Sequence, residues 1–162
     1  MRYEDADESL VEVYLKVAEE RFPNTCANLN IKLLFDTKRR VSKGKIVLAS
    51  IEIASEKIKY FTKHEVKVGQ GVDYIMTVDR KAWELANEKD RIRLLSHELR
   101  HVFIDEKGKH KTLPHDIEDF AVEVKLNEDD PSWGTKLATL VTDIYEQEKE
   151  LKKLNKKQGA AK

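Results

Sequence analysis

The chain has 162 residues, which is enough for one domain with a substantial core but short for two. Its 30 basic and 30 acidic side chains cancel, which argues against a bulk electrostatic grip on nucleic acid. The single cysteine excludes an internal disulfide and fits a reducing compartment. No signal peptide is visible, and no apolar run approaches the length of a membrane span. We therefore expect a cytoplasmic protein without membrane contact.

The first half of the chain predicts a helix followed by strands. Apolar residues at helical spacing predict a helix from about Ser9 to Phe22, which Pro23 ends. A second, short helix is expected over Arg80–Asn87, where Trp83 and Leu85 would enter the core. Three apolar runs between these helices predict strands, namely Asn30–Phe35, Ile46–Ile53 and Val72–Val78.

Basic residues gather in the turn between the first two predicted strands. Lys38, Arg39 and Arg40 are followed by Lys43 and Lys45. Such a run most often marks a solvated hairpin tip. A phosphate or nucleic-acid site is the alternative interpretation of this turn.

The pentapeptide 97–101, His-Glu-Leu-Arg-His, is the most informative segment of the chain. Apolar residues at helical spacing surround it, Asp90 can cap the helix, and no Pro or Gly interrupts before Gly108. Because residues four apart share one helix face, His97 and His101 can bind the same metal ion. Glu98, next to the first ligand, can take a proton from a metal-bound water. This H-E-x-x-H pattern is typical of zinc peptidases.

A catalytic zinc needs a third protein ligand as well. A polar turn follows the helix, and a second helix is predicted to begin within Thr112–Phe120. His115 lies at the start of that helix, close to the chain reversal, and is the first candidate. Glu118 is the alternative, because a glutamate on a following helix completes the site in other zinc peptidases. His110, between two lysines, is a weaker candidate.

The last predicted helix opens at Asp130 and Pro131, and its apolar residues have a helical, nearly heptad spacing. Its second half is highly charged and either projects from the domain or pairs with a partner helix. We expect one domain over residues 1–162, with a core of about 5–145 followed by the charged helix and a frayed tail, 146–162.

Four segments together resemble the phage-type metallopeptidase domain family. That family shows an apolar strand, a Trp-containing helix, a Ser- or Asp-His-Glu-Leu-x-His helix and a His-Asp-x-Glu-x-Phe segment. This chain has Asp73–Val78, Ala82–Leu85, Ser96–His101 and His115–Phe120 in these places, and the resemblance covers about residues 5–125. It implies an α+β, zincin-like fold. In that fold a small mixed sheet of three or four strands packs against the H-E-x-x-H helix, with N-terminal and C-terminal helices.

The resemblance also implies a set of site residues. Zinc would be bound by His97, His101 and His115, and Glu98 would act as the catalytic acid and base. Arg100 departs from the family pattern, which has a Cys or a neutral residue there, and we expect its side chain to be solvated on the outer face of the helix.

These observations predict a zinc-dependent metallopeptidase that acts on a peptide or protein substrate. Tyr74 or Tyr145 could donate a hydrogen bond to the tetrahedral oxyanion. An edge strand, Tyr74–Val78 or its neighbour, could bind the extended substrate backbone; a fully paired interior strand is the alternative. The alternative function is a catalytically silent, zinc-stabilised binding module of phage or mobile-element origin. The substrate and the oligomeric state are not predicted.

Overall fold

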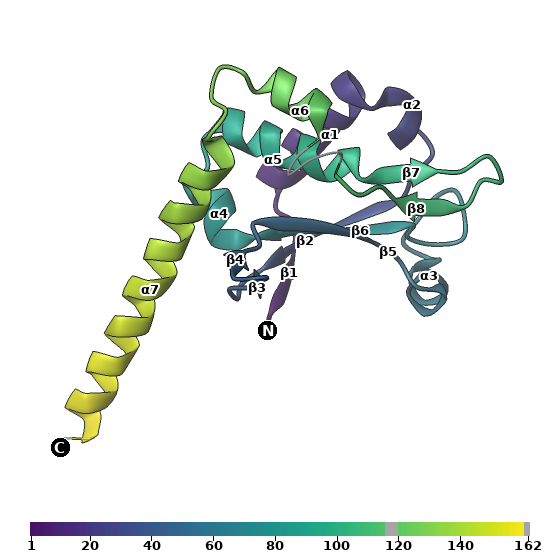
Figure 1. The fold of residues 1–162 in the computed structure, drawn as a ribbon. Coiled ribbons are helices and arrows are strands. Elements are labelled where there is room, and N and C mark those ends of the chain that lie inside the picture. The colour runs from purple at the N-terminus through teal and green to yellow at the C-terminus, as the bar shows by residue number, and fades with distance from the viewer. Residues whose placement is uncertain (116–119, 161–162) are drawn as a thin grey trace.

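A computed structural model describes residues 1–115 and 120–160 of the chain (Figure 1). Its centre is a four-stranded mixed sheet with the strand order β1-β2-β6-β5. The strands are β1 (Tyr3–Asp5), β2 (Ile31–Asp36), β5 (Ala49–Ile53) and β6 (Tyr74–Asp79). β2 is parallel to β6, whereas β1 and β5 run antiparallel to their neighbours. The predicted α+β class and the small mixed sheet are therefore confirmed.

Two short hairpins flank the sheet. One is formed by β3 (Val41–Ser42) and β4 (Lys45–Ile46), and the other by β7 (Val102–Ile104) and β8 (His110–Thr112). The hydroxyl of Tyr74 donates to the carbonyl oxygen of Lys111 at 2.8 Å and lies 3.1 Å from that of Phe103, both in the second hairpin. This buried tyrosine therefore fixes the β7–β8 hairpin to the sheet.

Seven helices complete the described fold: α1 (Glu8–Arg21), α2 (Pro23–Cys26), α3 (Glu56–Thr62), α4 (Arg80–Leu85), α5 (Glu88–Arg100), α6 (Ala121–Leu126) and α7 (Trp133–Ala160). Figure 1 shows α1, α2, α5 and α6 on one side of the sheet. α7 starts beside α5 and runs away from the body, so that its C-terminal half projects. No helix in the described part of the chain has the length and apolar character of a membrane span.

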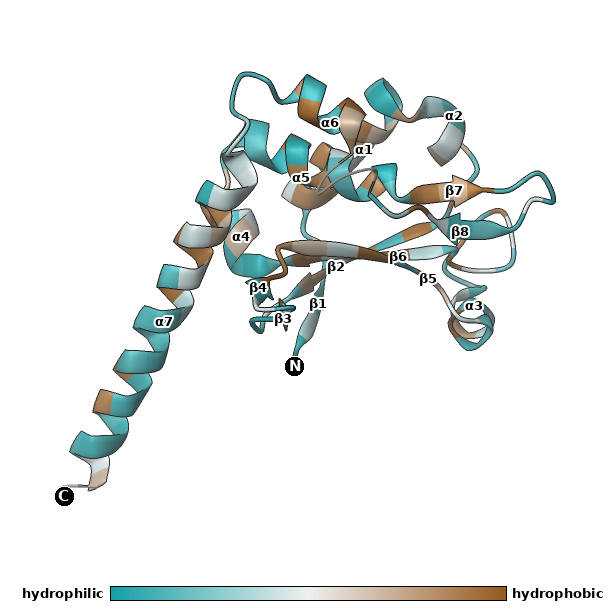
Figure 2. Cartoon of the chain, in the orientation of Figure 1, coloured by the Kyte–Doolittle hydropathy of each residue, from teal (hydrophilic) through white to brown (hydrophobic). Residues whose placement is uncertain are grey.

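The core lies between the sheet and the helices α1, α5 and α7. Side chains alternate along a strand, so one face of β2 and β6 supplies Phe35, Tyr74, Met76 and Val78, which are all fully buried. Helices contribute a second set of buried residues to the same cluster, including Leu10, Val17, Leu95, Leu99, Leu137 and Val141. Burial of each large apolar side chain is worth about 1.5–3 kcal/mol. Figure 2 shows hydrophobic residues in brown. Packing of the buried ones fixes the position of α5 relative to the sheet.

The ends of the helices differ from the predictions. Asn87, not Asp90, caps α5, because its side chain accepts a 2.8 Å hydrogen bond from the Asp90 backbone N–H. α5 ends at Arg100, and the apolar run after it forms β7, with Val102 opposite Thr112 of β8. The helix predicted within Thr112–Phe120 does not begin at Thr112, since Thr112 ends β8 and residues 113–115 have no regular structure; the next described helix is α6, which begins at Ala121.

The strand order decides between the alternatives for Tyr74–Val78 and its neighbour. β6 pairs with β2 on one side and β5 on the other, so Tyr74–Val78 is an interior strand. Its neighbour β5 is the edge strand. Ile51 of β5 lies opposite Met76, and therefore faces the helices and the residues that α5 presents.

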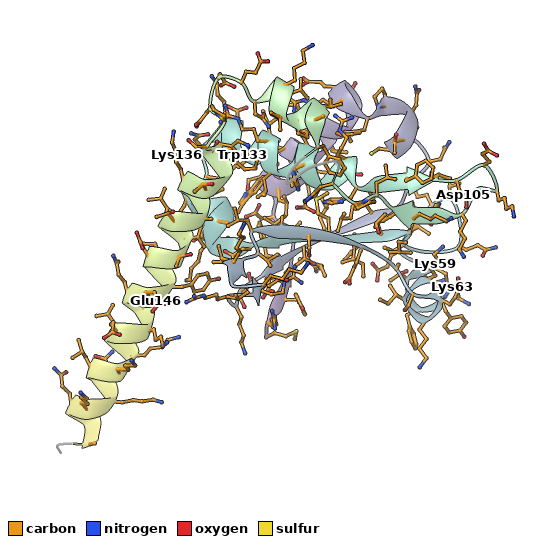
Figure 3. The ribbon with its side chains drawn as sticks, viewed as in Figure 1. Lys59, Lys63, Asp105, Trp133, Lys136 and Glu146 are labelled. Carbon is orange, nitrogen blue, oxygen red and sulfur yellow. The ribbon has the colours of Figure 1, made fainter. Side chains whose placement is uncertain are left out.

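α7 is attached to the body along its N-terminal half. Trp133 is buried at its first turn, and Figure 3 shows this residue beside the body and Glu146 further along the helix. The Tyr145 hydroxyl donates a 2.7 Å hydrogen bond to Asp79, whose buried carboxylate also caps α4. Burial raises the pKa of Asp79, and the hydrogen bonds from Ala82 and Tyr145 oppose that shift.

Candidate metal centre

Three histidines meet above the sheet, close to β5. His97 lies in the last turn of α5 and His101 is the C-cap of that helix, so one helical turn separates them. His115 comes from the irregular segment after β8. The hairpin β7–β8 reverses the chain between His101 and His115, which brings this segment back to the end of α5.

The geometry of the three rings suits a metal ion. His115 Nε2 lies 3.0 Å from His97 Nε2 and 3.1 Å from His101 Nε2. Three nitrogens that bind one tetrahedral zinc at about 2.05 Å lie about 3.3 Å from one another. A single proton on His115 could bridge only one of these two nitrogen pairs. The convergence of three ring nitrogens is therefore better explained by a shared cation, and these residues fit a divalent metal.

The protonation of His101 follows from its backbone partner. Its Nδ1 lies 2.6 Å from the carbonyl oxygen of Leu113, which can only accept a hydrogen bond. The proton of the neutral ring must therefore lie on Nδ1, and Nε2 presents its lone pair to the other two rings. A carbonyl that orients a ligand imidazole in this way is a common feature of metal sites.

Phe120 forms an apolar wall beside the three rings. It is almost fully buried, and its ring centroid lies 5.6 Å from that of His97, 4.8 Å from that of His101 and 5.0 Å from that of His115. Sequence reasoning missed the position of this phenylalanine beside the histidines, although it belongs to the His-Asp-x-Glu-x-Phe segment. Apolar packing of this kind restricts the ring orientations and lowers the access of water to the site.

Glu98 lies in the same cleft as the histidines. Its side chain is 6% exposed, and it lines an open cavity of about 530 Å³ together with the three rings. One wall is the edge strand, through Ala49–Ile51, and the other is the segment 112–115. A carboxylate beside a candidate metal site and open to the same cavity can accept a proton from a bound water.

A second cavity of about 790 Å³ continues the cleft, and His97, Glu98 and Ala49 line both. It runs between the β3–β4 hairpin and the first turns of α7. Its lining on the helix side includes small side chains, namely Gly134, Thr135, Ala138 and Thr139. The two cavities together form a groove, and His97 and Glu98 lie where the cavities meet, while His101 and His115 line the first cavity alone.

A buried polar cluster fixes the end of α5 from behind. Glu123 of α6 is fully buried, and its Oε1 accepts hydrogen bonds from Ser96 at 2.8 Å and from Arg100 at 3.0 Å. Arg21 of α1 donates to the same serine at 3.0 Å. The guanidinium of Arg100 also lies 4.5 Å from the ring centroid of Phe22. Arg100 is therefore an inward-facing link between helices, and the expectation that it is solvated is wrong.

We expect Glu123→Ala to destabilise the protein by about 2–3 kcal/mol, because it leaves Ser96 and the half-buried Arg100 without their acceptor. Urea denaturation would measure the loss. Glu84→Ala is the matched control, since Glu84 forms an exposed ion pair with Arg80 and its removal should cost less than about 0.5 kcal/mol. Equal effects of both changes would contradict the role of Glu123.

Other candidate residues lie outside the cluster. His110, the weaker candidate for the third ligand, is part of β8, where its ring lies 3.4 Å from Asp73 and packs against Tyr74. Tyr74 and Tyr145 direct their hydroxyls to backbone carbonyls and to Asp79, and neither lines the histidine cleft. Glu118, the alternative third ligand, falls outside the described residues.

Fold and site define a mixed α+β protein with a three-histidine cluster that can hold a metal ion. Residues 1–155 match the family described as putative phage metallopeptidase, and the chain belongs to this family, as the sequence resemblance predicted. A search of curated proteins gives no match.

Proposed function

We propose that the chain is a zinc-dependent peptidase of zincin-like architecture, in which His97, His101 and His115 hold the metal and Glu98 transfers protons. One observation carries this proposal. His115 Nε2 lies 3.0 Å from His97 Nε2 and 3.1 Å from His101 Nε2, close to the spacing of nitrogen ligands around one zinc ion, and a buried glutamate lies beside them. Membership of a metallopeptidase family supports the reaction class.

Neutral imidazoles suit zinc as well as copper, nickel and iron, and three protein ligands with one open position are typical of a catalytic zinc site. His97, His101 and His115 would hold the zinc, which would supply a water with a pKa of about 7 and a Lewis acid for the carbonyl of the scissile bond. Glu98 accepts the proton of the attacking water and then delivers it to the leaving amine. Leu113 keeps the lone pair of His101 directed at the metal through its hydrogen bond to Nδ1.

The groove supports a peptide as substrate. Its two cavities meet at Glu98, so an extended chain could occupy both sides of the bond to be cleaved. The edge strand β5 forms one wall, and an extended backbone could add to it by main-chain hydrogen bonds that demand no particular sequence. Small side chains on α7 leave room for substrate side chains at one end.

The test uses the protein purified without a histidine tag. We expect about one zinc per chain and cleavage of an unfolded protein substrate. Cleavage should stop when a chelator removes the metal and return when zinc is added. Stoichiometric zinc with no cleavage of unfolded proteins or of a peptide library would instead identify a silent binding module. A protein that binds no divalent metal would contradict both interpretations.

A further inference from the structure

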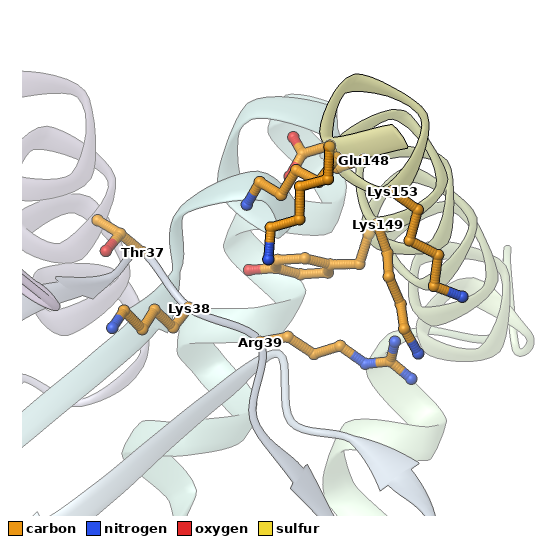
Figure 4. Close-up of a pocket in the computed structure, with 9 residues that line it drawn as sticks. Thr37, Lys38, Arg39, Glu148, Lys149 and Lys153 are labelled. Carbon is orange, nitrogen blue, oxygen red and sulfur yellow. The ribbon is translucent and has the colours of Figure 1, made fainter. Parts of the chain in front are cut away.

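A cleft with a strong positive charge lies far from the histidines, between the projecting part of α7 and the loop that joins β2 to β3. Its volume is about 450 Å³. Figure 4 shows Arg39 extending from the loop toward α7, while Lys149 and Lys153 extend from the helix. We call it the basic cleft, because six cationic side chains line it: Lys38, Arg39, Lys149, Lys152, Lys153 and Lys156.

Acidic residues neutralise the basic cleft only in part, and Lys153 is paired with Glu150 at 3.6 Å. Glu148 is bound by Lys81 at 2.5 Å, and Glu146 is bound by Arg39 at 2.5 Å. The pKa of the Glu146 carboxyl is lowered, first by the hydrogen bond from Arg39 and then by the charge of Lys149. Among the described residues, Lys149 forms no ion pair. The same is true of Lys152 and Lys156, which leaves three ammonium groups of α7 available to an anion.

The four lysines that α7 contributes to the basic cleft are spaced at about one helical turn. Positions 149, 152, 153 and 156 fall within about 100° of arc, so they share one face of α7. Lys149 and Lys156 are separated by about 10 Å along the axis, a length over which one strand of a duplex carries about three phosphates. The opposite face of this segment carries Leu151 and Leu154, so these four lysines gather on the side that faces the loop.

We propose that the basic cleft binds the phosphodiester backbone of a nucleic-acid strand. Its two walls are a helix and a loop, and a strand can contact both at once, whereas a flat membrane surface reaches only the rim. Arg40, the next residue of the loop, is not part of it, because it donates to Ser50 of β5. Contacts of this kind carry no base specificity. The zero net charge of the chain indicated no nucleic-acid binding, but that sum hides the local concentration of lysines.

The proposal can be tested by fluorescence anisotropy with a labelled single-stranded DNA of about 20 nucleotides. Neutralisation of about four phosphates predicts an affinity that falls by about 50-fold between 50 and 200 mM salt. The variant Lys149→Gln, Lys152→Gln, Lys153→Gln, Lys156→Gln should bind at least about tenfold more weakly at low salt. Glutamine is nearly as good a helix former as lysine, so α7 should persist, and circular dichroism would verify this.

A matched control removes four lysines elsewhere on the surface, as Lys57→Gln, Lys89→Gln, Lys107→Gln and Lys125→Gln. Its net charge equals that of the first variant, and its affinity for DNA should stay close to that of the wild type. Equal losses in both variants would mean nonspecific attraction and overturn the proposal. Binding to phosphatidylserine vesicles without binding to DNA would also overturn it, and so would displacement of DNA by an equal charge of polyglutamate.

Discussion

Glu98→Gln should lower the rate of peptide cleavage by about 10²–10⁴-fold while the protein still binds zinc. Glutamine keeps the size and hydrogen-bonding capacity of the side chain but cannot accept a proton from the attacking water. Because Glu98 is buried and lines both cavities of the groove, we expect no other described carboxylate of the cleft to replace it. The measurement is the turnover of a quenched fluorescent peptide, together with the zinc content of the same sample.

Glu106→Gln is the matched control, since Glu106 lies exposed in the turn between β7 and β8. It should leave both cleavage and zinc binding unchanged. Turnover that survives Glu98→Gln would remove this residue from the mechanism. Loss of zinc in the same variant would show that Glu98 serves the metal site and would leave its catalytic role without support.

His115→Ala should lower the zinc affinity by at least about 100-fold, because it removes one of three ligands from the cluster. His110→Ala offers a close comparison: the same side chain is removed from the neighbouring strand, where it faces Asp73 instead of the cluster. A competitive zinc titration with a chromophoric chelator would measure both affinities. The His110 variant should bind zinc as the wild type does.

A His115 variant that retains full zinc affinity would contradict the assignment of this ligand. The third ligand would then have to come from another residue, and Glu118, in the segment outside the described residues, would become the first candidate. A stability measurement on the metal-free proteins distinguishes ligand loss from misfolding, since His115 is exposed and its removal should cost little without zinc.

The paired histidines were predictable because their relation is local. A spacing of four residues on a helix fixes which face both rings share, whatever the rest of the fold does. The approach of His115 depends instead on a chain reversal, which the polar turn after the helix indicated. Its immediate context differed from the prediction, because the residue follows strand β8 and lies in the irregular segment 113–115.

The errors in the predictions have a common physical origin in long-range contacts. Val102 and Phe103 continue an apolar helical pattern, yet they pair with β8, and this pairing overrides local propensity. Arg100 and Glu123 look like ordinary surface charges in the sequence, but α6 brings the buried carboxylate to the guanidinium. Nothing in the spacing of these two residues indicates that they meet.

The origin of the three ligands in two different parts of the chain has a consequence for folding. His97 and His101 are held by a packed helix, whereas His115 is held by an irregular segment beyond a hairpin. A bound ion would therefore act as a cross-link that closes a loop between residues 101 and 115. Opening the hairpin would then require release of a ligand from the ion. Opening fluctuations of the hairpin, as hydrogen exchange detects them, would then become rarer in the metal-loaded protein, while the sheet beneath would keep its own protection.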